Sequence, residues 1–182
     1  MRWPQLKYNA GRIRGRPLTS SSSEIDSLNS AKYLFLRELS EPRNNSLRLL
    51  VQEAVNNMSA QGSIRSDIPG FAEILTGSWP MEPVEGCKSF ELVWERYAAY
   101  LVTEELVGSG GGYGDETYTG RLLRVYSKSH FLDHLARDTG GHVEPIQHYK
   151  LICLNHLIDV ASYAPPEIRL IDLALPPPLR IQ

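Results

Sequence analysis

Five histidines, His130, His134, His142, His148 and His156, cluster in one part of the chain. Histidine is the side chain most often used for proton transfer and metal binding near neutral pH. Within the segment HFLDH, His130 and His134 are one helical turn apart, which is the spacing of zinc-binding pairs. The order H-x-x-D-H also resembles the H-x-x-E-H motif of one metallopeptidase class. These residues suggest a metal-dependent hydrolase.

The helical pattern around this pair argues against a metal centre. At about 100° per residue, the apolar residues Phe131, Leu132, Leu135 and Ala136 form the buried side of the helix. His130 and His134 then point to the solvated side, and the sequence assigns them no third ligand. We therefore expect no cofactor and keep the hydrolase as the alternative function.

The remaining chemistry-bearing residues lie in an apolar run that the sequence predicts as one central strand, residues 148–161. At about 3.3 Å per residue, a regular strand would separate His148 from His156 by roughly 26 Å, too far to share an ion. Cys153 and His156 would face opposite sides of that strand, so they would not form a nucleophile–base pair. Cys153, between two apolar residues, is predicted to be a small core residue. With only one other cysteine, Cys87, a reduced compartment is favoured over a disulfide framework.

A glycine-rich segment, Gly108–Gly114, matches neither common phosphate-loop signature. Asp115 and Glu116 follow it and would repel a phosphate. From Glu82 to Glu116 the only cations are Lys88 and Arg96, against eight carboxylates. This charge disfavours nucleic-acid binding by the middle of the chain. If the chain binds nucleic acid, we expect the basic N-terminal segment to do so. Its basic residues are Arg2, Lys7, Arg12, Arg14 and Arg16.

The acidic stretch instead suggests a surface for a protein partner. Glu91 and Glu95 share a face whether the segment is strand or helix, and an aromatic residue, Tyr97, accompanies them in one of the two forms. Carboxylates steer the encounter with a basic partner, and an aromatic ring supplies buried area. The partner-binding residues predicted are Glu91, Glu95, Tyr97, Glu104 and Glu105. The alternative is a charged outer face that serves only solubility.

The spacing of apolar residues along the chain predicts an α+β fold. N-terminal helices are followed by an antiparallel sheet, with a helix between two of its strands. Residues 1–23 are expected to form a basic arm and Ser-rich linker, residues 24–175 a single domain, and residues 176–182 a Pro-rich tail. Helices are predicted at residues 25–39 and 47–58, from the spacing of their apolar residues, and again after Ser127 or Ser129 as N-cap. Strands are predicted at residues 118–126, 148–161 and 168–173.

Residues 87–106 fit either a strand or a helix, because Phe90, Leu92 and Trp94 alternate while Phe90, Trp94 and Leu101 also match a helical stripe. Aromatic enrichment favours one long or bent strand. Residues 107–117 would then be a hairpin loop leading into the strand at 118–126.

No apolar run reaches the roughly 18–20 residues that cross a bilayer, and no secretory signal is apparent. We therefore expect a soluble, cytoplasmic protein without a membrane partner.

Three segments, EGCKSFELVWERYAAYLVTEE, YSKSHFLDHL and HYKLICLNHLIDVAS, resemble those of a group of uncharacterised bacterial single-domain proteins, a domain of unknown function. The resemblance covers about residues 67–171 and carries no assigned chemistry. Small proteins of this kind include immunity partners of secreted toxins, so the resemblance implies an immunity-type role by analogy only. The function expected is therefore a non-enzymatic protein-binding module, of immunity type, that binds a basic toxin through its acidic face.

Overall fold

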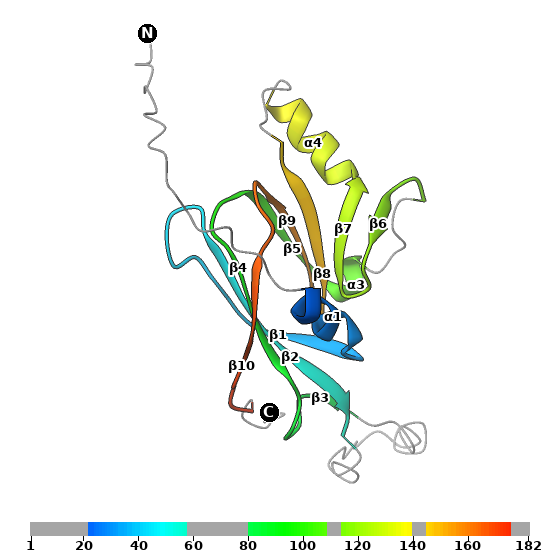
Figure 1. Cartoon of the computed structure of the whole chain (residues 1–182). Helices are drawn as coiled ribbons and strands as arrows, with labels where there is room; N and C mark the ends of the chain where they lie inside the picture. Colours follow the sequence, from blue (N-terminus) through cyan, green and yellow to red (C-terminus); the bar gives the residue numbers. More distant parts are fainter. Residues whose placement is uncertain (1–21, 58–79, 109–113, 140–144, 176–182) are drawn as a thin grey trace, which may run out of the picture.

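The structure is a computed structural model that describes residues 22–57, 80–108, 114–139 and 145–175 (Figure 1). The predicted arm, the Pro-rich tail and His142 lie largely or wholly outside these ranges. In chain order the elements are α1 Ser22–Ser30, β1 Tyr33–Ser40, β2 Leu47–Asn56, β3 Met81–Glu82, β4 Ser89–Trp94, β5 Tyr97–Glu104, α3 Glu105–Gly108, β6 Thr117–Thr119, β7 Leu123–Lys128, α4 His130–Asp138, β8 Gln147–Ile152, β9 His156–Ser162 and β10 Glu167–Ile171. Among the helices described, none has the length and apolar character needed to cross a membrane.

The strands form two antiparallel sheets that share one hydrophobic core (Figure 1). The first sheet has the order β1-β2-β4-β10, with β3 paired to the end of β2, and the second has the order β5-β9-β8-β7-β6. Large apolar side chains from both sheets are buried between them, including Phe90 and Trp94 from the first and Leu151 and Ile158 from the second. Burying one such side chain stabilises the fold by roughly 1.5–3 kcal/mol.

The predicted α+β class is confirmed, and α4 connects the neighbouring strands β7 and β8 as expected. Ser129 caps α4, because its side chain accepts a hydrogen bond from the Leu132 amide. The strand predicted near the C-terminus is also present, as the edge strand β10.

The prediction of two long N-terminal helices is wrong. The first helix ends at Ser30 and the chain continues as β1, while the second predicted helix is the strand β2. Leu47, Leu49 and Val51 face the core, and Leu50 is buried on the opposite face of β2. A strand covered on both faces has a continuous apolar sequence, which resembles the stripe of a helix.

Within the segment 87–106, residues 89–104 are extended, as favoured, but they are not one strand, and Glu105 and Leu106 already belong to α3. The extended stretch breaks at Glu95–Arg96, so β4 belongs to the first sheet and β5 to the second. The hairpin expected between this segment and residues 118–126 is absent, because β9 and β8 lie between β5 and β7. The single strand predicted at 118–126 is also wrong, because β6 and the start of β7 are two strands that pair antiparallel. The passage of the chain from the first sheet to the second at Glu95–Arg96 depends on tertiary packing, which local residue patterns do not reveal.

The run 148–161 is likewise two strands, because the chain reverses at Cys153–Asn155 and β8 pairs with β9. This turn also joins the two sheets at the outer side of β1. The Leu154 amide donates to the Leu34 carbonyl at 2.8 Å. The Asn155 side chain accepts from the Leu36 amide at 2.9 Å and donates to the Leu36 carbonyl at 3.0 Å. The side-chain amide of Asn155 thus pairs with Leu36 as the backbone of a neighbouring strand would.

Replacing Asn155 measures how much this contact between the two sheets contributes to the free energy of unfolding. We expect Asn155→Ala to lower the free energy of unfolding by about 1–3 kcal/mol, because it leaves both backbone groups of Leu36 without these partners. The matched control is Asn44→Ala at an exposed turn position, expected to change stability by less than about 0.5 kcal/mol. Urea denaturation measures both, and equal losses for the two variants would contradict the proposed join.

Candidate functional site

The most chemically capable group in the described structure is a buried chain of hydrogen bonds centred on His148. Ser129 Oγ lies 2.7 Å from His148 Nδ1, and His148 Nε2 lies 2.8 Å from Asp159 Oδ1. The ammonium of Lys150 is 3.3 Å from the same carboxylate oxygen. A serine, an imidazole and a carboxylate in this order have the composition of a nucleophilic triad.

The β8–β9 hairpin and α4 bring these groups together on the outer face of the second sheet. Lys150 lies directly opposite Asp159 in the strand register, and His148 is two residues before Lys150 on the same face. Ser129 arrives from the start of α4. The ring of Tyr126 stacks on the imidazole with centroids 4.2 Å apart, and the ring of Phe131 lies 5.2 Å from it.

The sequence prediction missed this network because it treated residues 148–161 as one strand. In a single strand, His148 and Asp159 would be far apart; in the hairpin they are in contact. The available signal was Asn155, a turn-forming residue within an otherwise apolar run.

The network is arranged to hold structure rather than to react. Ser129, His148 and Asp159 are only 3%, 2% and 6% exposed, so a substrate carbonyl cannot reach Ser129 Oγ in this conformation. Nucleophilic catalysis requires the attacking atom to lie about 3 Å from the reacting carbon. Ser129 Oγ instead accepts from the Leu132 amide and bonds to His148, which fastens α4 to the sheet. Cys153 is also sequestered, and burial raises the pKa of its thiol far above the usual range.

The predicted metal ligands His130 and His134 lie on the exposed part of α4 and do not converge. His130 Nε2 lies 2.7 Å from Asp115 Oδ1, and His134 Nε2 lies 3.5 Å from Asp138 Oδ2. Hydrogen bonds from Lys128 and His130 lower the pKa of Asp115 to about 2. Within the described ranges, no three metal-ligating side chains come together.

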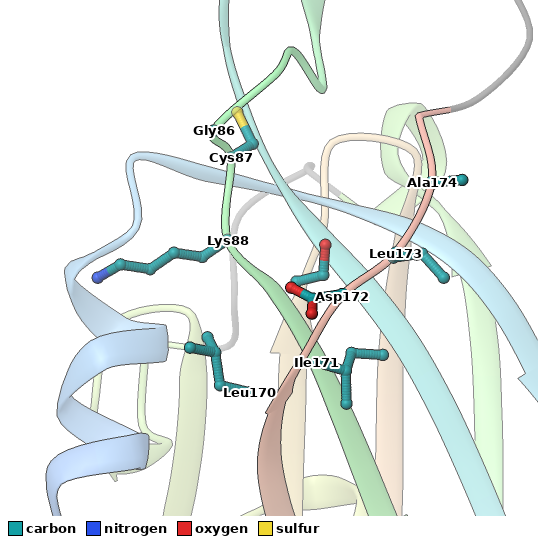
Figure 2. Close-up of a pocket in the computed structure, with 9 residues that line it drawn as sticks. Gly86, Cys87, Lys88, Leu170, Ile171, Asp172, Leu173 and Ala174 are labelled. Atoms are coloured by element: carbon teal, nitrogen blue, oxygen red, sulfur yellow. The ribbon is translucent and has the colours of Figure 1, made fainter.

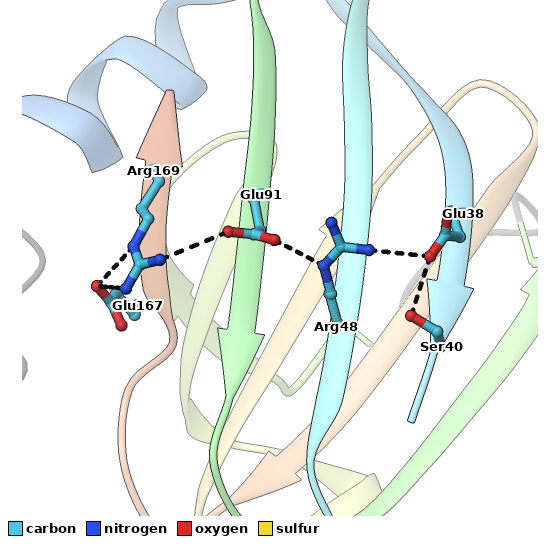
Figure 3. Close-up of polar contacts among 6 residues, drawn as sticks. All are labelled: Glu38, Ser40, Arg48, Glu91, Glu167 and Arg169. Atoms are coloured by element: carbon cyan, nitrogen blue, oxygen red, sulfur yellow. Dashed lines mark hydrogen bonds and ion pairs between the residues drawn. The ribbon is translucent and has the colours of Figure 1, made fainter. Parts of the chain in front are cut away.

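Two of the predicted partner-binding residues, Glu91 and Glu95, already have arginine partners. Figure 3 shows Glu91 between Arg48 and Arg169 in a row of alternating charges across β10, β4, β2 and β1. Glu91 Oε1 lies 2.6 Å from Arg48 Nε, and its side chain is 16% exposed. Glu95 pairs with Arg43 at 2.9 Å. Arginines of the first sheet and of the β1–β2 connection therefore already pair with both carboxylates.

Tyr97 also has an internal role. Its hydroxyl donates to Glu41 Oε1 at 2.9 Å, and the hydroxyl of Tyr100 donates to the same oxygen at 2.8 Å. Partial burial, followed by the bond to Glu41, raises the pKa of Tyr97. The pair ties β5 to the loop after β1.

Glu104 and Glu105 are different, because they form no ion pair with any described residue and sit at the open edge of the second sheet. Leu101 and Val102 of β5 are 50% and 38% exposed. The other edges are covered or short: the turn at Leu154–Asn155 covers β1, α1 contacts β10, and β6 has only three residues. The β5 edge, defined here as residues 98–105, is the longest uncovered edge in the described structure and the candidate binding surface.

A surface hollow of about 560 Å³ lies between the start of β4 and the segment after β10 (Figure 2). Its charged side chains do not converge on a common point. Lys88 extends toward α1, where its ammonium donates to Ser27 Oγ at 3.2 Å, whereas Asp172 lies on the opposite wall. A ligand site needs several polar groups aimed at one place, and this hollow lacks them.

Comparison with family models, curated proteins and solved structures finds no significant match to this chain. The resemblance seen in the sequence therefore remains a prediction.

Two serine variants distinguish a structural network from a catalytic one. Ser129→Ala removes the helix cap and the bond to His148, so we expect a loss of about 1–2 kcal/mol of unfolding free energy. Ser127→Ala, an exposed neighbour, should cost less than about 0.5 kcal/mol. Asp159→Ala should cost about 3 kcal/mol, because it leaves His148 and Lys150 without their carboxylate.

The same proteins can be treated with a fluorophosphonate that labels activated serines. We expect no labelling of Ser129. Stoichiometric modification of Ser129, detected by peptide mass spectrometry, would contradict the structural role and indicate an accessible nucleophile.

Proposed function

We propose that this protein is a non-enzymatic protein-binding module that docks an extended segment of a partner along the β5 edge. The observation that supports it best is the edge itself, where two apolar side chains are exposed beside Glu104 and Glu105. Soluble proteins normally protect such edges, because unpaired backbone groups recruit other strands. An edge left uncovered is a template for strand addition.

The residues of the edge define the chemistry of the partner segment. Backbone hydrogen bonds supply affinity without sequence preference, while Leu101 and Val102 project to opposite faces and favour apolar neighbours. Glu104 and Glu105 favour a basic residue at the corresponding end of the segment and steer its approach. Inhibition of a basic toxin, as in an immunity protein, is one specific form of this function.

Of the partner-binding residues predicted from sequence, only those at the end of β5 are kept in this proposal. Glu91, Glu95 and Tyr97 are engaged within the fold, whereas Glu104 and Glu105 form no ion pair among the described residues. The hydrolase alternative has less support, because His130 and His134 are not joined by a third ligand among the described residues.

A synthetic peptide tests this function directly. We expect a short peptide of alternating valine and threonine, with two arginines at one end, to shift the amide NMR signals of residues 98–105 on titration. The same peptide with glutamates in place of arginines should bind at least about tenfold more weakly, because it meets Glu104 and Glu105 with like charge.

The matched protein variants are Glu104→Lys with Glu105→Lys, expected to invert the peptide preference, and Glu85→Lys, an exposed acid near the first sheet that should leave it unchanged. Equal binding of both peptides, or signal changes confined to other strands, would sink the proposal.

A further inference from the structure

The two ends of β5 carry opposite charges. Arg96 immediately precedes the strand and is exposed, with its guanidinium 4.1 Å from the centre of the Tyr163 ring. The two carboxylates at this end already have partners, Glu95 with Arg43 and Glu41 with the hydroxyls of Tyr97 and Tyr100, and the Tyr97 amide donates to the Asn45 carbonyl. Glu104 and Glu105 stand at the other end. Between them, residues 97–103 contain no charged side chain and no proline, two of the devices that prevent one sheet edge from pairing with another. The β-bulge at Tyr97–Ala99, a third such device, affects only the start of the strand.

This arrangement is self-complementary in only one direction. When two copies of β5 lie side by side antiparallel, the acidic end of each copy meets the end of the other that carries Arg96. The same contact occurs twice, as required by a twofold axis. Parallel pairing would place the glutamates of the two copies next to each other, which is unfavourable. The charge pattern thus selects the antiparallel arrangement.

The exposed apolar residues fall at the centre of this pairing. Residues that meet across antiparallel strands must project to the same face, so Leu101 of one copy lies beside Leu101 or Ala99 of the other, close to the axis. A β-bulge between Tyr97 and Ala99 limits regular pairing to the part of the strand from Ala99 onward. The following helix, α3, contacts β5 and β9, on the inner side of the edge strand.

We infer that the occupant of the β5 edge in the isolated protein is a second copy of this chain, paired antiparallel so that the two second sheets become one continuous sheet. This inference rests on the edge-docking function proposed above and names the partner of that site. A partner segment with arginine at the matching end would then bind by displacing the second copy.

A charge exchange between two variants tests the inference. Sedimentation velocity of the full chain over a range of concentrations should show a reversible monomer–dimer equilibrium. Arg96→Glu places like charges at both contacts, and so does Glu104→Arg with Glu105→Arg. Each variant alone should associate at least about tenfold more weakly than the original chain. An equimolar mixture of the two variants restores both opposite-charge contacts, so association should return to within a few-fold of the original.

A second variant covers the case in which Arg96→Glu fails to fold after losing its contact with Tyr163. Leu101→Lys changes a half-exposed side chain and brings two lysines together near the axis, so the dimer should be lost. The thermal midpoint should match that of the original chain when both are measured at a concentration where the original chain is monomeric. Glu85→Arg is the control and should dimerise like the original chain.

A chain that stays monomeric at all concentrations would overturn the inference, and so would a mixture that associates no better than its separate components. If the monomeric chain still binds the arginine peptide at residues 98–105, the edge-docking function stands and only the second copy is excluded. If neither association occurs, both proposals fail.

Discussion

The reversal of the chain at Cys153–Asn155 is the constraint on which most of this structure depends. It divides a long apolar run into two paired strands, and it places Asp159 beside His148 instead of far along the same strand. It also carries Asn155 to the outer side of β1, where the side chain satisfies the backbone of Leu36. A single turn therefore supplies the central hairpin of the second sheet, the partner of a buried imidazole and a link to the first sheet.

The buried network follows from that turn. A carboxylate at 6% exposure is costly unless it has partners, and Asp159 has two, His148 and Lys150. The imidazole in turn engages Ser129, which caps α4. Since α4 has no fully buried residue of its own, these polar contacts, with the ring of Phe131 on His148, fix its position. Groups that suggest catalysis in isolation here serve to attach a helix to a sheet.

The sequence was informative where structure is set locally. The helix α4, for which Ser129 is one of two cap candidates, and the extended conformation of residues 89–104 depend on neighbouring residues. The sequence predicts the first and favours the second. The helix predicted at 47–58 failed because burial on both faces of β2 removes the alternation that identifies a strand. The break at Glu95–Arg96 and the order of the strands depend on contacts between residues distant in sequence. No local pattern shows that β5 is the edge strand of its sheet. The sequence therefore predicts that the binding surface is acidic but not where it lies.

The glutamates show why strand order decides which acidic residues are available. Glu91 lies in β4, between β2 and β10, and both neighbours place an arginine beside it. Glu104 has a neighbouring strand, β9, on one side only, and the residue opposite it there is His156. Opposite-charge pairs across neighbouring strands contribute only about 0.2–1 kcal/mol each, so the row of charges on the first sheet helps to fix the register of its strands and adds modestly to their stability. At the edge of the second sheet, Glu104 forms no such ion pair with any residue that the structure describes. An ion pair between Glu104 and a bound chain can therefore favour one partner or orientation over another. In a dimer with a twofold axis, this ion pair would form twice.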